Sequence, residues 1–165
     1  MRNLHPVFEI PLDIRLGRVM HMTSGLLALM IAAIFTGAAL YVNVAEQPAR
    51  LTLDDGALLT EWKPSYKRGF AMQAPLALLG SVLGALAWWQ TSHPAFLMGA
   101  FAMISAWPWT ILVIKPTNDA LLETEIDKAG PLSRAFIVRW GWLHAARTGF
   151  GALATLAFLW GSMQR

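Results

Sequence analysis

The sequence predicts an all-α protein, an integral membrane four-helix bundle with a short amphipathic surface helix between its third and fourth spans. Three observations predict this fold. Hydrophobic residues make up 56% of the chain and charged residues only 14%, whereas soluble domains carry about a quarter charged residues. The charges lie between long apolar runs. Trp and Tyr lie near the ends of those runs, where a membrane protein meets the headgroups.

Four apolar runs approach or exceed the roughly 20 residues that a helix needs to cross about 30 Å of hydrocarbon. The first three contain no Lys, Arg, Asp or Glu, whereas the fourth carries His144 and Arg147 near its start. We interpret residues 1–165 as a single transmembrane domain with spans at about 22–44, 69–90, 95–114 and 140–161.

The connections between the spans differ in length. Residues 91–94 alone join the second and third runs, which must therefore form an antiparallel hairpin. The longer segments 45–68 and 115–138 lie on the opposite face, and the second of them carries the predicted surface helix, with Asn118 as its N-cap. Eight Lys and Arg residues lie on this long-loop face against four on the face of the termini, which favours cytoplasmic long loops.

The composition excludes several classes of function. The absence of cysteine removes disulfides, thiolate metal sites and thiol catalysis. A formal net charge of +3 does not indicate a nucleic-acid partner, and basic residues beside spans instead favour contact with lipid headgroups. One His and one Glu at a shared depth are too few ligands to assign a metal site, so no residue is predicted to bind a metal.

Polar side chains gather at one depth, at the long-loop end of the spans. Arg147 lies about two turns into the fourth run, where an ionisable group costs at least ~2.5–3.5 kcal/mol and usually faces the bundle interior. We expect Glu46 to pair with Arg147, and His144 to exchange a proton beside that pair. The alternative is a purely structural pair and a structural histidine. The side chains expected to contact a ligand are Tyr41, Asn43, Trp107, Trp109, Asn118 and Trp142.

Four segments of the chain carry a family resemblance that extends over nearly the whole chain from the first span onward. They read ALYVNVAEQPAR (39–50), WKPSYKRGFAMQAPLALLG (62–80), PWTILVIKPTNDALL (108–122) and LHAARTGFGALA (143–154). They resemble the anthrone oxygenase-like family of small four-helix membrane proteins. The resemblance implies oxidation of an anthrone to a quinone with no required cofactor, because the deprotonated substrate itself reacts with oxygen.

The resemblance also implies roles for individual side chains. His144 suits the base, and Arg147 or Asn118 suits the partner of the developing oxyanion. Trp107, Trp109 and Trp142 suit stacking on a planar ring system.

The leading hypothesis is therefore an oxidoreductase of the bacterial inner membrane that binds a planar quinone- or phenol-like molecule at the long-loop end of the bundle. Its expected partners are the lipid bilayer and a hydrophobic aromatic small molecule. Two alternatives stay open. One is a non-catalytic subunit or assembly factor of a larger membrane complex, and the other is a haem- or metal-binding membrane protein.

Overall fold

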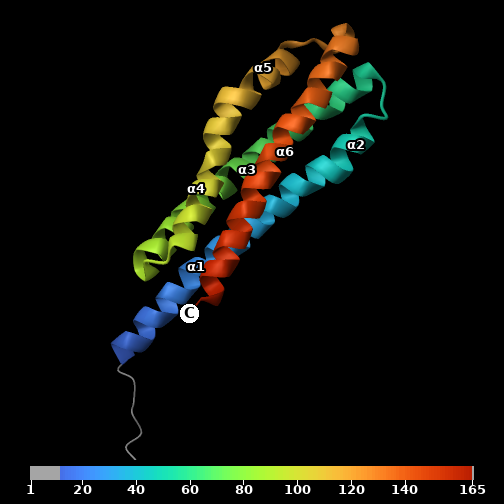
Figure 1. Ribbon diagram of the computed structural model, residues 1–165. Helices are drawn as coiled ribbons and strands as arrows, with labels where there is room; N and C mark the ends of the chain where they lie inside the picture. The colour runs from blue at the N-terminus through green and yellow to red at the C-terminus, as the bar shows by residue number, and fades with distance from the viewer. Residues whose placement is uncertain (1–11, 165) are drawn as a thin grey trace, which may run out of the picture.

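A computed structural model describes the chain from residue 12 to residue 164, and its side chains from residue 23 to residue 164. Within this part the chain is helical apart from short connections and contains no strand, which confirms the all-α prediction. The long helices are α1 (Leu12–Tyr41), α3 (Asp55–Thr91), α4 (Pro94–Trp109) and α6 (Pro131–Met163). They run side by side along one elongated bundle (Figure 1), in which α1 and α4 each pack against both α3 and α6.

Among the described residues, three continuous helical segments are long and apolar enough to cross a membrane, which indicates an integral membrane protein. They are Thr23–Arg50, Asp55–Thr91 and Pro94–Glu123. α6 has 33 residues but is not among these three, and its sequence contains Arg134, Arg139 and Arg147. The fourth crossing therefore stays a prediction.

The helices extend well beyond the predicted apolar runs. α3 begins at Asp55 rather than near residue 69, and α6 begins at Pro131 rather than near residue 140. Much of the segment 45–68, expected to be a polar connection, is thus helical on both sides of the short stretch 51–54. Hydropathy marks only the part of a helix that suits hydrocarbon, so the polar ends of these helices were missed.

Two π-helical turns lengthen the bundle at the long-loop end. α1 continues through η1 (Val42–Glu46) into α2 (Gln47–Arg50), and α4 continues through η2 (Thr110–Ile114) into α5 (Lys115–Glu123). Each π turn comes just before a proline, Pro48 or Pro116. A proline lacks an N–H and clashes with the carbonyl four residues earlier, and the wider turn lets the helix continue past it.

This continuation changes the interpretation of residues 115–123. Asn118 lies inside α5 and is not an N-cap, because the helix has already begun upstream of Pro116. A separate amphipathic surface helix between the third and fourth spans is therefore not confirmed.

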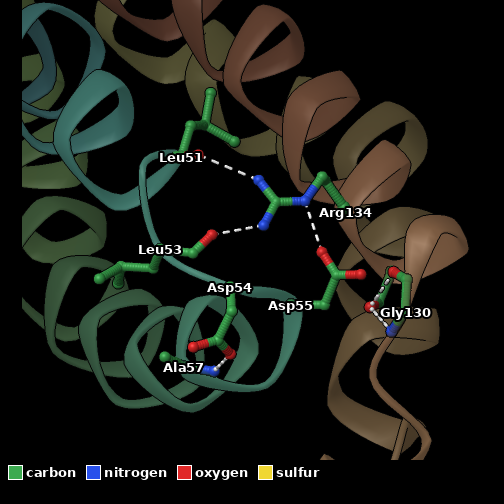
Figure 2. A network of polar contacts seen from close by, with 8 residues as sticks. Leu51, Leu53, Asp54, Asp55, Ala57, Gly130 and Arg134 are labelled. Carbon is green, nitrogen blue, oxygen red and sulfur yellow. Dashed lines mark hydrogen bonds and ion pairs between the residues drawn. The ribbon is translucent and has the colours of Figure 1, made fainter.

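The turn between α2 and α3 is fastened to α6 by Arg134 (Figure 2). Its guanidinium donates to the carbonyl of Leu51 at 3.0 Å and to that of Leu53, and its Nε lies 2.5 Å from the carboxylate of Asp55. Two backbone carbonyls and one carboxylate thus hold the chain just after Arg50, the last residue of α2.

Candidate functional site

A cavity of about 390 Å³ lies towards the long-loop end of the bundle, among α1, η1, α2, α3 and α6. This volume falls in the range of roughly 300–1,000 Å³ that is usual for small-molecule sites. Four side chains that the sequence singles out line it: Tyr41, Glu46, His144 and Arg147. The structure therefore places the three predicted catalytic side chains around one space.

His144 is held by a side chain from the π turn η1. Its Nδ1 lies 3.1 Å from Oδ1 of Asn43, and the hydroxyl of Thr148 donates to the same oxygen at 2.8 Å. The amide nitrogen of Asn43 donates to the carbonyl of Gly141 at 2.9 Å. Asn43, predicted as a ligand contact, does not line the main cavity but lies behind His144, against a groove on the outer side of α6.

An aromatic wall stands beside His144. The ring of Trp140 stacks on the imidazole with centroids 4.9 Å apart, and Trp62 meets Trp140 edge-on at 5.7 Å. Trp62 in turn stacks on Tyr66 at 4.9 Å. Trp140 and Tyr66 line the cavity and were missed as site residues. The sequence pattern that could have identified them is a spacing of four residues, which places two side chains on one helix face. Trp62 and Tyr66 have this spacing, as do Trp140 and His144.

Glu46 does not pair with Arg147. It accepts from the guanidinium of Arg50, four residues later, and Nε of Arg50 lies 3.0 Å from Oε2 of Glu61 on α3. The predicted Glu46–Arg147 pair is wrong, because the helix continues through Arg50 and brings that side chain next to Glu46. The buried Arg50 also lies 5.8 Å from the ring centroid of Trp140.

Arg147 is therefore a buried cation without a counter-ion. Its side chain is only 6% exposed, and no described carboxylate lies within ion-pair distance. Its Nε is buried and has no hydrogen-bond partner, while its Cζ lies 5.7 Å from the ring centroid of Phe35. A charge in this position is costly unless a partner compensates it. Arg147 also lines the cavity, so this uncompensated guanidinium borders its space.

A sequence model of the anthrone oxygenase family matches residues 62–157. The chain belongs to the anthrone oxygenase family. No curated protein and no solved structure matches it. The family match covers the side of the cavity built by α3 and α6, with Tyr66, Trp140, His144 and Arg147, whereas Glu46 on η1 lies outside the matched residues.

The remaining predicted residues of this anthrone oxygenase family member lie outside the main cavity. Asn118 is buried and donates to the hydroxyl of Tyr66 at 3.1 Å, so it supports a cavity residue from behind. The indoles of Trp107 and Trp109 donate to backbone carbonyls of α3 and α6 at 3.3 and 3.0 Å. Trp142 is 77% exposed and lines the outer groove beside Asn43.

Metal ligands are sparse in the part of the chain with described side chains. Residues 23–164 contain no group of three or more His, Cys, Asp or Glu side chains that could hold a metal ion. The ionisable side chains that line the cavity include His144, the ion-paired Glu46 and Arg50, Arg68, and the uncompensated Arg147.

Proposed function

We propose that this protein oxidises a planar, anthrone-like phenol to the corresponding quinone inside the membrane. The observation that carries the proposal is the position of Arg147, a buried guanidinium without a counter-ion, on the same cavity as His144. A histidine that accepts a proton and a cation that receives the resulting negative charge are the two groups that formation of a substrate anion needs.

The proposed reaction begins with proton transfer. His144 takes a proton from the methylene carbon of the anthrone, and the electron pair moves through the ring to the carbonyl oxygen, where Arg147 compensates the charge. Dioxygen is the oxidant. One of its atoms becomes the new carbonyl oxygen of the quinone, and the other leaves as water with the two hydrogens of the former methylene carbon.

The aromatic wall supports a planar substrate. Trp140 and Tyr66 line the cavity, and planar molecules gain both apolar burial and stacking from aromatic neighbours. In this proposal Glu46 acts indirectly, since it holds Arg50 in the cavity wall and leaves the charge of Arg147 free for the substrate. Asn118 acts through the hydroxyl of Tyr66.

We also propose that α6 crosses the bilayer as a fourth span, with the long loops in the cytoplasm of a bacterial cell. α6 packs along both α1 and α4, which are themselves part of segments apolar enough to cross. Its outer face carries large exposed apolar side chains, among them Leu153 and Leu156. Such side chains suit contact with lipid.

Purified protein in lipid nanodiscs tests the activity. An anthrone is added in air-saturated buffer, and quinone absorbance and oxygen uptake are followed together. We expect catalysed quinone formation with equal molar oxygen uptake, and a loss of about 10²–10⁴-fold in His144→Gln, the usual range for a general base. Arg139→Gln, an exposed arginine on the same helix, is the matched control. A rate equal to that of empty nanodiscs, or an unimpaired His144→Gln variant, contradicts the proposal.

A further inference from the structure

The side chain of Asn43 has only one orientation that fits its surroundings. Its two amide atoms face a backbone carbonyl, that of Gly141, and the side chains of His144 and Thr148. A backbone carbonyl can only accept a hydrogen bond, so the atom that faces Gly141 must be the amide nitrogen. The amide oxygen therefore faces His144.

This orientation decides which ring nitrogen of His144 carries a proton. The oxygen of Asn43 can only accept, so Nδ1 of His144 must donate to it. Nδ1 carries a proton both in the neutral imidazole and in the imidazolium cation. The atom of His144 that gains or loses a proton is consequently Nε2.

A second amide keeps Asn43 in register with α6. Gln47, four residues later, donates to the carbonyl of Ile137 at 2.8 Å, just as Asn43 donates to that of Gly141. Two amides one turn apart thus bind two carbonyls one turn apart. Gly141 permits this approach, because an added Cβ there would lie 2.8 Å from Nε2 of Gln47.

We infer that Asn43 is a positioning residue, which fixes the proton of His144 on Nδ1 and reserves Nε2 for proton exchange with the ligand. The effect of Asn43 on catalysis rests on the proposed function, whereas the position of the proton on the ring of His144 does not. Thr148 contributes by donating to the same oxygen and holding it in place.

Nitrogen-15 NMR of histidine-labelled protein tests the state of the ring without any substrate. The chain has four histidines, and the signals of His144 are assigned as those that His144→Gln removes. Under conditions where the ring is neutral, we expect a protonated Nδ1 and an unprotonated Nε2 in the wild type. In Asn43→Leu we expect a mixture of the two tautomers. A wild-type ring protonated on Nε2 alone overturns the inference, whatever the activity.

Turnover tests the catalytic consequence. We expect Asn43→Leu to lower kcat on the order of 100-fold with little change in KM, because a misplaced catalytic group costs about that much. Thr148→Val is the milder variant if Asn43→Leu does not fold, and it should shift the same NMR signals by a smaller amount.

Gln47→Leu is the matched control, since it removes the neighbouring amide–carbonyl bond to α6 without touching His144. A loss of kcat in Gln47→Leu equal to that in Asn43→Leu would show a merely structural role. If no anthrone is turned over by the wild type, the proposed function fails, while the NMR result still decides the role of Asn43.

Discussion

Glu46 accepts a hydrogen bond from Arg50, four residues later in the same continuous helical segment. This contact occupies the carboxylate that was the best-placed partner for Arg147, and Glu61 adds a second carboxylate to Arg50 rather than to Arg147. The arginine in α2 is thus doubly compensated, whereas the buried arginine in α6 is not. The cavity between them thus has one wall where the charge of Arg50 is balanced internally and another where the charge of Arg147 has no counter-ion among the described side chains.

The first prediction concerns ligand charge at Arg147. Arg147→Gln removes a hydrogen-bonding cation from the cavity wall, and such charge-assisted bonds contribute about 1.5–3 kcal/mol. We therefore expect Kd for a planar phenolate to rise roughly 10- to 150-fold. Quenching of tryptophan fluorescence, with Trp140 on the cavity wall, measures the binding.

A neutral analogue without the ionisable hydroxyl provides the control ligand for this prediction, and its affinity should change little. The ligand-free Arg147→Gln protein should melt no lower than the wild type, because an uncompensated buried charge has been removed. Equal losses of affinity for the charged and neutral ligands would contradict a role of Arg147 in anion binding.

The second prediction separates support from chemistry at Glu46. Glu46→Gln leaves the buried Arg50 with Glu61 as its remaining carboxylate. We expect a loss of about 1–3 kcal/mol and a fall in Tm on the order of 5 °C, with turnover that remains measurable in the folded protein. We expect a similar loss of stability, with measurable turnover, in Glu61→Gln. Thermal melts and anthrone turnover at a temperature where the variants are folded provide the test. Abolished turnover with an unchanged Tm would instead assign Glu46 a direct chemical role.

Hydropathy and the cost of buried charge predicted the outline of the site. His144 and Arg147 interrupt an apolar run, and polar groups in such runs face the interior of a bundle, so their position on the cavity followed from the sequence. The three helices able to cross were predicted for the same reason, since an apolar run of sufficient length is a property of the sequence alone.

The orientation of individual side chains could not be predicted in this way. A π turn holds an additional residue, so η1 and η2 rotate whatever follows them around the helix axis, and nothing in the periodicity marks such a turn. Which tryptophans of α6 face the cavity depends on the rotation of that helix about its own axis, which its packing against its neighbours sets. Trp140 lines the cavity, whereas Trp142, two residues later, points to the opposite side and is exposed.

The third prediction concerns close packing below the site. An added Cβ at Gly99 on α4 would lie 2.3 Å from Cε1 of Phe158, a fully buried side chain on α6. Overpacking of this kind costs about 1–3 kcal/mol, so Gly99→Ala should lower Tm, and Phe158→Leu in the same chain should restore part of the loss. Gly149→Ala on α6 is the control, since an added Cβ there meets nothing within 4 Å. A Gly99→Ala variant as stable as Gly149→Ala would contradict the observed packing.

The fourth prediction concerns the crossing of α6. The chain lacks cysteine, so single cysteines can be introduced into an otherwise unreactive protein. Asp127 lies in the exposed segment before α6, Gln164 follows α6, and Ser92 lies between α3 and α4. Figure 1 shows the α3–α4 turn and the end of α6 at the same end of the bundle. If α6 crosses the membrane and the long loops are cytoplasmic, a membrane-impermeant maleimide added to intact spheroplasts should label Gln164→Cys and Ser92→Cys. It should label Asp127→Cys only after the cells are permeabilised. Labelling of residues 127 and 164 from the same side would exclude the fourth crossing. The reverse labelling pattern would keep the crossing but invert the orientation, which rests only on the distribution of Lys and Arg.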